Sequence, residues 1–427
     1  MNLALLAWKS AKARAGTTLL TILSIAISTA LLLGVEKIRE GARSSFAQTV
    51  SGTDLIVGAR SGPINLLLYS VFRIGDPTAN VSWESYEAFS KRSDVAWTVP
   101  LSLGDSHDGY RVLGTTTDYF KHYRYSAKRQ LSFVEGGSFS DVFDAVLGAE
   151  AARALGYTLG DEFNIAHGIV SAGFTEHKNR PFKVIGVLSR TGTPVDQTIH
   201  VSLEGIEAVH LGWNNGAPPP IGRGGSTISR NNRSSDIDKS ALQPDAITAF
   251  LVGLKSKSAV LRYQREVNTY RSEALSAVIP GVALSQLWRV VGSAEQALRG
   301  VALFVIAAGL TGLLTTILTS LNERRREIAV LRSVGAKSRD VFSLLVCEAT
   351  ILAAIGAIIG VIVINLGLFL FSQPIEAAAG FPLGDFGLSL YDFYIFLGVV
   401  FIGFLLGFLP GWLAYRRSLS DGLTVKI

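Results

Sequence analysis

The sequence predicts an α-helical membrane protein with four transmembrane helices and a large mixed α/β extracytoplasmic domain between helices one and two. Three observations support this. The 427 residues are 48% hydrophobic and only 17% charged, which is too apolar for a soluble protein of this size. Four charge-free runs are long enough, at about 20 residues each, to cross a bilayer as helices. Between the first two runs, short β-rich stretches alternate with Gly, Pro and Asp.

The four runs divide the chain into segments. We expect transmembrane helices at residues 17–35, 300–321, 341–373 and 391–415. Between and around them we expect a cytoplasmic interfacial helix (1–16), a periplasmic domain with helical stalks (36–299), a cytoplasmic coupling helix (322–340), a periplasmic loop (374–390) and a cytoplasmic tail (416–427).

The first run could be read as a secretory signal, because Lys9, Lys12 and Arg14 precede an apolar segment. A signal has an apolar region of about 7 to 15 residues that ends in a small-residue cleavage site. The run from Thr17 to Val35 is longer and ends in Leu-Leu-Leu-Gly-Val. We therefore expect an uncleaved membrane anchor.

The basic residues predict the orientation of the spans. They gather at the N-terminus (Lys9, Lys12, Arg14), between spans two and three (Arg324, Arg325, Arg326, Arg332, Lys337, Arg339) and in the tail (Arg416, Arg417, Lys426), whereas Ser372 to Leu390 contains no Lys or Arg. Basic flanks remain in the cytoplasm. Both termini are thus expected in the cytoplasm of a bacterial inner membrane protein, and the net charge of +6 needs no nucleic acid partner.

The segment between the first two spans predicts an α/β domain. Its expected strands are Tyr110–Gly114, Ala145–Gly148, Glu162–Ala166, Phe182–Leu188, Thr198–Ser202 and Ala249–Leu254. Ser82 is an N-cap candidate for a helix to Arg92, and Gly156 is a C-cap candidate for a helix over Glu150–Leu155. Helical stalks are expected over Glu36–Ala47 and Ser256–Leu287, and a mobile loop at about 213–244, which is poor in large apolar residues.

No catalytic or metal-binding constellation is present in the sequence. Gly335-Ala336-Lys337-Ser338 does not match the phosphate-binding pattern Gly-x-x-x-x-Gly-Lys-Ser/Thr, and no zinc hydrolase motif occurs. Cys347 is the single cysteine, so a disulfide within the chain is excluded. The six histidines lie in the extracytoplasmic segment without helical ligand spacing, so structural roles are favoured over a metal site, which could still be assembled in three dimensions.

The loop after the second span carries the most specific pattern. As a helix, it places Ile328, Leu331 and Val334 or Gly335 on one face among charged residues, with Gly335 as the stop. A basic loop that served only topology would not need this apolar face. We therefore expect an amphipathic docking helix.

Two glycine patterns predict close helix packing. They are Gly356-x-x-x-Gly360 and Gly403-x-x-x-Gly407-x-x-x-Gly411. Small residues on one helix face allow backbones to approach closely in lipid. The pattern fits a dimer interface and packing within the chain equally well.

The segment from Glu323 to Lys337 closely resembles the signature of the MacB/FtsX-like permeases of ABC transporters (type VII), the group that includes the lipoprotein-releasing LolC and LolE subunits. The resemblance extends over most of the chain, including Ala145–Ile165, Phe182–Leu188, Gly114–Phe120, Pro410–Lys426 and Leu5–Arg14. In this sequence Ser24 and Ser28 stand where many members carry glycine, which bears on how closely the first helices approach.

The resemblance implies a non-catalytic permease. It implies a dimer with an identical or homologous second permease, bound to two copies of a separate cytoplasmic ABC ATPase that holds ATP and Mg; this chain itself needs no cofactor. It implies mechanotransmission, in which ATP-driven closure moves the stalks and outer domains. The ATPase contacts that it implies are Glu323, Arg324, Arg325, Arg326, Glu327, Ile328, Leu331, Arg332, Gly335 and Ala336.

Three versions of this function are open: extraction of lipoproteins or lipids from the outer leaflet, export of peptides or small molecules with a periplasmic adaptor and an outer-membrane channel, and regulation of a cell-wall hydrolase. The large outer domain favours the first two. A membrane receptor or sensor that signals through an ATPase partner is the alternative from a different class.

Overall fold

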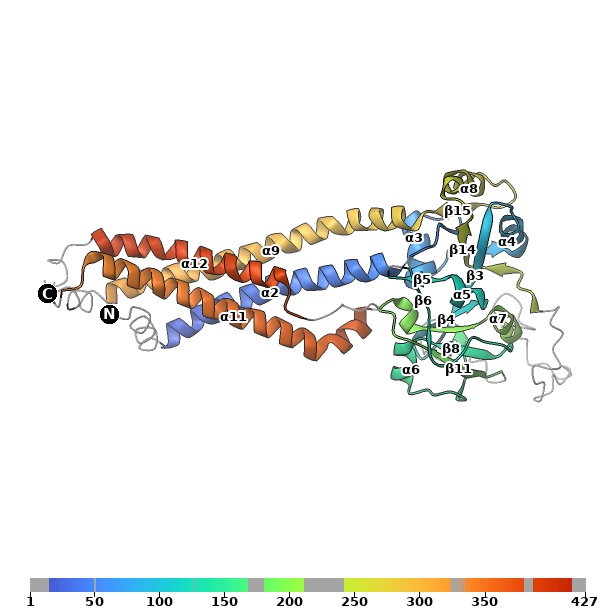
Figure 1. Ribbon diagram of the computed structural model, residues 1–427, viewed down its shortest axis with the longest axis horizontal. Helices are drawn as coiled ribbons and strands as arrows, with labels where there is room; N and C mark the ends of the chain where they lie inside the picture. Colours follow the sequence, from blue (N-terminus) through green and yellow to red (C-terminus); the bar gives the residue numbers. More distant parts are fainter. Residues whose placement is uncertain are drawn as a thin grey trace, which may run out of the picture. The chain divides into compact units, whose positions relative to one another are not determined.

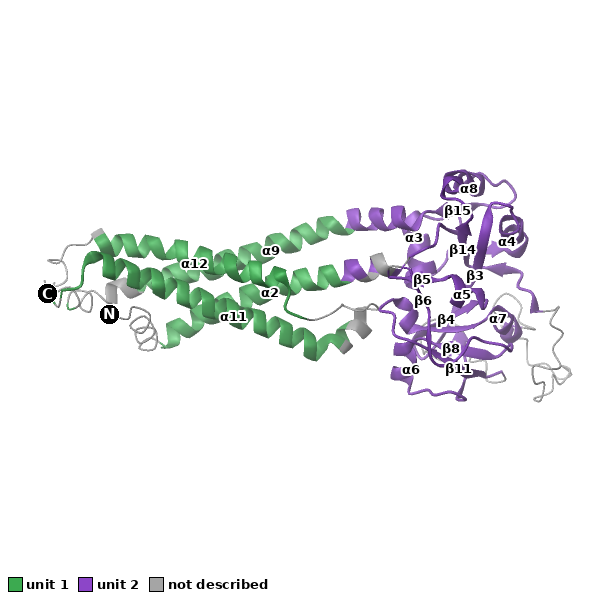
Figure 2. Ribbon diagram, in the orientation of Figure 1, with its two compact units in different colours: residues 1–41, 291–378, 383–427 green, residues 42–290, 379–382 purple. Residues whose placement is uncertain are grey.

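The computed structural model describes residues 15–49, 51–126, 128–167, 180–210, 242–323, 330, 333, 335–379 and 387–416. Contacts divide the chain into two compact units (Figures 1 and 2). The first contains residues 1–41, 291–378 and 383–427, and the second contains residues 42–290 and 379–382. The predicted interfacial helix, the tail after Arg416 and most of the loop at 213–244 lie outside the described residues.

The first unit is built from four long apolar helices, which run side by side in Figure 1. They are α2 (Ala15–Thr49), α9 (Pro280–Glu323), α11 (Ser338–Ala379) and α12 (Leu390–Arg416). Each contains a window apolar enough to cross a membrane. The prediction of four spans is therefore confirmed, and the chain is a multi-pass membrane protein.

Two of these helices are far longer than a bilayer requires. Helix α9 has 44 residues and α2 has 35. At 1.5 Å per residue their lengths are about 66 Å and about 52 Å, against a hydrocarbon core of about 30 Å. Both helices must therefore extend beyond the membrane.

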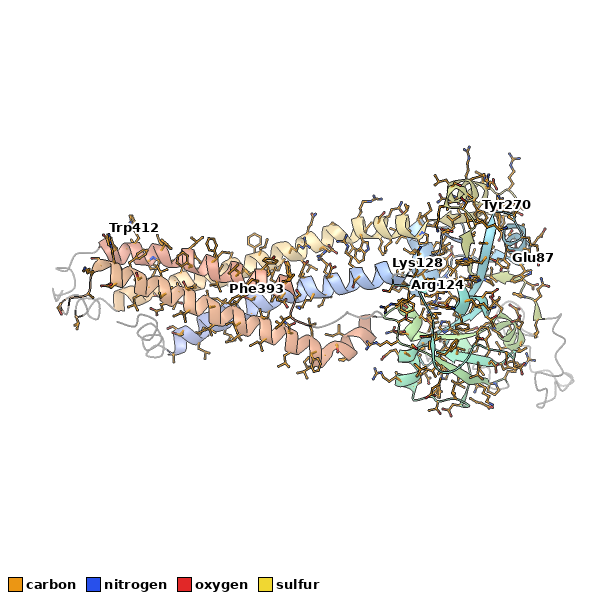
Figure 3. The ribbon with its side chains drawn as sticks, in the orientation of Figure 1. Glu87, Arg124, Lys128, Tyr270, Phe393 and Trp412 are labelled. Atoms are coloured by element: carbon orange, nitrogen blue, oxygen red, sulfur yellow. The ribbon has the colours of Figure 1, made fainter. Side chains whose placement is uncertain are left out.

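Aromatic side chains mark both ends of α12. Tyr391, Phe393 and Tyr394 are exposed near its start, and Trp412 and Tyr415 near its end; Phe393 and Trp412 are labelled in Figure 3. Tyr394 and Trp412 are separated by about 27 Å along a helix, which is close to the thickness of the hydrocarbon core. Aromatic residues favour the interfaces of a bilayer, so this spacing fits a membrane-spanning α12.

The second unit is built on an 11-stranded mixed sheet with the order β15-β1-β14-β3-β4-β12-β8-β11-β7. Strands β12 and β11 pair in parallel with β4 and β8, respectively, and the other neighbours are antiparallel. Strand β10 pairs with β3 and β9 pairs with β11. The strands of the main path are β1 (Leu55–Ala59), β3 (Val95–His107), β4 (Tyr110–Thr115), β7 (Phe133–Gly136), β8 (Asp144–Leu147), β11 (Phe182–Leu188), β12 (Thr198–Ser202), β14 (Ala249–Leu254) and β15 (Leu275–Val278).

Short elements complete this unit. Six two-residue strands are β2 (Val81–Ser82), β5 (Arg124–Tyr125), β6 (Arg129–Gln130), β9 (Glu162–Phe163), β10 (Ala166–His167) and β13 (Ala246–Ile247). The helices are α3 (Pro63–Leu67), α4 (Trp83–Ser90), α5 (Asp118–His122), α6 (Ala149–Leu155), α7 (Leu203–His210) and α8 (Val260–Asn268). A short π-helix (Leu68–Phe72) and two 3₁₀ helices (Pro194–Gln197 and Lys257–Ala259) lie between them.

Burial on both faces of the sheet explains its apolar strands. In β1, Ile56 belongs to a core that includes Tyr119 and Phe120, whereas Leu55 and Val57 pack with Phe89 of α4 and the helix α8. A third core joins β8, β11 and β12 to α6 and α7. Because successive strand side chains point to opposite faces, a strand between two cores is a continuous apolar run.

Most local predictions for the second unit are confirmed. Strands β11, β12 and β14 have the predicted bounds, β4 extends one residue further, and β8 is shifted by one residue toward the N-terminus. The predicted strand at Glu162–Ala166 is divided into β9 and β10. Ser82 caps α4 by accepting from the Ser85 amide, and Gly156 ends α6 with a φ of 72°.

The stalk predicted over Ser256–Leu287 is wrong as a continuous helix. Helix α8 ends at Asn268, strand β15 follows, and only then does α9 begin at Pro280. Leu275 and Ala277 are buried where β15 pairs with β1. A proline removes one helical hydrogen bond, so Pro280 suits the first turn of α9 and not the interior of a longer helix.

The loop predicted at 374–390 begins too early. Helix α11 continues through Pro374 to Ala379, and residues 380–386 lie outside the described part of the chain. Proline is tolerated within membrane helices, because neighbouring groups can satisfy the freed carbonyl.

Candidate functional site

The predicted coupling segment is described only at its edges. Helix α9 ends at Glu323, and the residues from Arg324 to Ala329, with Leu331, Arg332 and Val334, lie outside the described residues. Val330 is 61% exposed. Gly335 has a φ of 103°, the left-handed conformation of a glycine that ends a helix. The docking helix itself therefore remains a prediction.

The residues after this segment start the next helix. Ala336 is half-buried and lies outside any helix. The Asp340 carboxylate accepts a hydrogen bond from the Lys337 amide at 2.7 Å, in the first turn of α11. An acidic side chain there satisfies a free amide and favours the positive end of the helix dipole. The segment is thus enclosed by a glycine stop and a capped start.

The first glycine motif packs α11 against α2 of the same chain. A Cβ atom built on Gly356 would lie 2.8 Å from the Cβ of Ile25, and one on Gly360 would lie 2.7 Å from the Ala26 carbonyl oxygen. Real Cβ atoms do not approach so closely, so both positions require glycine. These contacts are with a neighbouring helix of the same chain.

The second motif packs α12 against α11. A Cβ on Gly403 would lie 2.4 Å from Ala353 Cβ, and one on Gly407 would lie 2.9 Å from Ala349 Cβ. On Gly411 it would meet the Phe342 ring at 2.9 Å. All five glycines predicted for helix packing thus contact helices of their own chain.

Helices α2 and α9 are joined by hydroxyl groups. Ser28 Oγ donates to the carbonyls of Val305 at 3.0 Å and Ser24 at 2.7 Å, and Thr21 and Thr316 share a hydrogen bond of 3.1 Å. A Cβ on Gly309 would lie 2.9 Å from Ser28 Oγ. The serines that stand in place of the family's glycines therefore still allow close approach, because Gly309 lies opposite.

Near Lys37, charged side chains link α2 to α12 and to α9. This residue of α2 contacts Asp392 of α12, and Glu36 and Arg39 of α2 contact Arg299 and Glu295 of α9. These residues were not among the predicted site residues. The Ser389-x-x-Asp392 pattern of a capping box at the start of α12 was a signal that could have identified one of them.

Two titratable groups of the second unit have strongly shifted pKa values. His200 on β12 is fully buried, its Nδ1 contacts the Val146 carbonyl at 3.2 Å, and the Tyr119 ring lies 5.3 Å away. Burial, with a smaller effect of Arg73, lowers the pKa of His200 to about 3. On α7, burial and then Asp245 raise the pKa of Glu207 to about 7.

These groups do not form a metal site within the described part of the chain, where no three His, Cys, Asp or Glu side chains gather suitably. His107 Nδ1 lies 2.6 Å from the Asn164 carbonyl and Nε2 lies 2.9 Å from Tyr157 Oη. His122 stacks on Trp97. His177 lies outside the described residues.

Comparisons with known proteins match both units. A model of the MacB-like periplasmic core domain matches residues 18–267, which is more than half of the chain, and a model of the FtsX-like permease C-terminal domain matches residues 299–422. An uncharacterised ABC transporter permease of Methanocaldococcus jannaschii is 31% identical over 122 residues, which are 28% of this chain and 29% of that protein.

Longer relatives cover nearly all of this chain. The macrolide export ATP-binding/permease protein MacB of Azoarcus sp. is 26% identical over 93% of this chain and 55% of its own length, and that of Wolinella succinogenes is 24% identical over 96% and 59%. The chain thus spans about half the length of these relatives. The crystal structure of the periplasmic region of MacB from Actinobacillus actinomycetemcomitans covers 56% of this chain and 94% of that chain, with 13% identity and a TM-score of 0.34. From the two family models and the four apolar helices, we conclude that the chain belongs to the MacB/FtsX-like family of ABC transporter permeases.

Proposed function

We propose that this permease couples ATP hydrolysis by a separate cytoplasmic ABC ATPase to movements of its extracytoplasmic domain, which extract or export a substrate. Two ATPase copies and a second permease complete the assembly. The relatives named above carry ATP-binding and permease functions together, whereas these 427 residues contain no Gly-x-x-x-x-Gly-Lys-Ser/Thr motif. We assign the ATP-binding function to a separate ABC ATPase chain as part of this proposal.

The observation that carries this proposal is the combination of a close-packed bundle with helices that outreach the membrane. Glycine contacts bring α11 against α2 and α12 against α11, and Leu313, Leu345 and Leu352 fill the interior. A bundle packed in this way transmits displacement better than it conducts a solute. Helices α2 and α9 can carry that displacement out of the bilayer.

The place where such movement acts suggests the classes of substrate. A domain outside the membrane can lift a lipoprotein or lipid from the outer leaflet, or drive a peptide or small molecule toward a periplasmic adaptor. The MacB proteins of Azoarcus sp. and Wolinella succinogenes are named for macrolide export; macrolides are amphiphilic small molecules, so export of an amphiphile is the first substrate class to test.

The decisive test is co-purification with an ABC-type ATPase in detergent, with hydrolysis recorded. The double variant Glu327→Lys, Leu331→Asp places two new repulsive charges on the predicted docking helix. We expect it to abolish both assembly and permease-stimulated hydrolysis, because an apolar docking face and its charged rim are both disrupted.

Ser333→Ala is the matched control. Ser333 lies in the same segment, is exposed and donates to the Val330 carbonyl. It should assemble and hydrolyse ATP as the unaltered chain does. Normal assembly of the double variant would remove the docking helix from the mechanism, and no assembly of the unaltered chain with any ATPase would favour a receptor or sensor.

Topology can be tested with the single native cysteine removed by Cys347→Ala. Cysteines introduced at Leu261, which is 70% exposed on α8, and at Ser333 report on the two sides of the membrane. With an impermeant maleimide, we expect labelling at 261 in intact spheroplasts and labelling at 333 only after lysis. The reverse pattern would invert the proposed orientation.

A further inference from the structure

A buried ion pair joins the start of α12 to α2. Lys37 Nζ donates to Asp392 Oδ2 at 2.9 Å and to the Gly387 carbonyl at 3.0 Å. The side chains are only 15% and 3% exposed. Since the lysine contacts the turn before α12 as well as its first turn, it holds the whole beginning of that helix.

The same carboxylate also starts α12. Asp392 accepts from the Ser389 amide at 3.0 Å, while Ser389 Oγ accepts from the amides of Tyr391 at 3.0 Å and Asp392 at 3.4 Å. This reciprocal arrangement is a capping box. The Asp392 side chain thus caps the first turn of α12 and also holds that turn beside Lys37 of α2.

A second group of charges joins α2 to α9 at the same level. Arg39 pairs with Glu36 and lies 3.7 Å from Glu295, and Arg299 lies 3.3 Å from Glu36. Arg299 is 47% exposed, and exposed pairs of this kind contribute little to stability. The Lys37–Asp392 pair differs because the Asp392 carboxylate, at 3% exposure, is the most buried charged group of this region.

Because it is largely buried, the Lys37–Asp392 pair restricts the axial position of α12 relative to α2. Apolar helix contacts tolerate sliding, whereas a buried carboxylate stays paired only while the ammonium group remains within hydrogen-bond distance. Sliding beyond the reach of the lysine side chain would leave the Asp392 carboxylate buried without its partner, which is strongly unfavourable.

We propose that Lys37 and Asp392 are positioning residues that make the start of α12 move together with α2. The inference rests on the proposed function, since it specifies how the fourth membrane helix follows a stalk helix during the ATPase cycle. In this mechanism, α12 is not a passive lipid-facing helix but is pulled by α2 at the level of Lys37.

The test is a distance measurement between spin labels in the full chain carrying Cys347→Ala. Labels at Ile38, which is 42% exposed, and Leu390, which is 77% exposed, report on α2 and α12 beside the pair without replacing it. In the unaltered pair we expect one narrow distance, unchanged between the nucleotide-free and ATP-bound complexes. In Lys37→Met we expect that single distance to be lost, and in Lys37→Arg we expect it to be retained.

The permease alone already separates this inference from the proposed function. A broader distance distribution in Lys37→Met, measured without any ATPase, supports the coupling of α12 to α2 even if no ATPase partner is found. Arg299→Gln, which removes an exposed pair of the same region, should leave the distance narrow. An unchanged narrow distance in a folded, monodisperse Lys37→Met protein overturns the proposal, as does broadening in Lys37→Arg equal to that in Lys37→Met.

Discussion

Replacing Gly403 by alanine is expected to destabilise the helix bundle by about 1 to 3 kcal/mol. The new Cβ atom would lie 2.4 Å from Ala353 Cβ. That atom is fixed to the backbone of α11, so the two helices must separate and lose contacts along their interface. Unfolding of the full chain in mixed detergent micelles measures the change.

Gly398→Ala is the matched control on the same helix. A Cβ there has no neighbouring atom within 4 Å, and alanine is favoured over glycine within a helix by up to about 1 kcal/mol. We expect this variant to be neutral or slightly more stable. Equal destabilisation at both positions would mean that Gly403 is not a close contact with α11.

Acidification is expected to destabilise the second unit through His200. Its pKa is about 3 in the folded protein, against an ordinary value of 6.5. Below pH 6.5 the unfolded chain takes up a proton that the folded chain refuses, so stability falls as the pH falls toward 3. Between pH 7 and pH 5 this group alone accounts for a loss of about 2 kcal/mol.

Glu207 acts in the opposite direction. Its pKa is about 7 when folded, against an ordinary 4.5, so it contributes stability at low pH that is lost as the pH rises from 4.5 through 7. Between pH 7 and pH 5 the gain through Glu207 is also about 2 kcal/mol, so the two groups nearly cancel in the unaltered chain. The variants His200→Asn and Glu207→Gln, each followed by thermal unfolding at pH 7 and pH 5, separate them.

His200→Asn keeps a donor for the Val146 carbonyl and removes the titration. This variant should become more stable on acidification, whereas Glu207→Gln should lose more stability than the unaltered chain. The same pH dependence in all three proteins would show that neither group titrates as its burial requires.

Local sequence patterns predicted much of the second unit, because strand and cap signals are short in range. The segment Phe182–Leu188 is rich in apolar residues and lies between turn signals, and the predicted strand has the observed bounds. Strand β3 was missed because Pro100, Gly104 and Asp105 interrupt its apolar pattern. Strand β3 is stabilised nevertheless by pairing with β4, which follows it directly, and with β14, which lies far along the chain.

The candidate site shows the same division. The glycine motifs were found from spacing, but spacing could not distinguish a second chain from a neighbouring helix, and contacts with Ile25 and Ala353 place them within the chain. Lys37 and Asp392 were passed over as ordinary charges beside apolar spans. These two residues matter because they pair with each other, and they lie too far apart in the sequence for a local pattern to contain both.

By itself the sequence determined the four spans, their basic flanks and the family of this permease, because transfer of about 20 apolar residues into lipid is a local property of one segment. Only the tertiary structure decided that α11 packs on α2 through Gly360, that α12 packs on α11 through Gly403, and that Lys37 meets Asp392. Lipid surrounds all four helices with the same apolar solvent, so the choice of neighbour depends on close contacts and buried hydrogen bonds between distant residues.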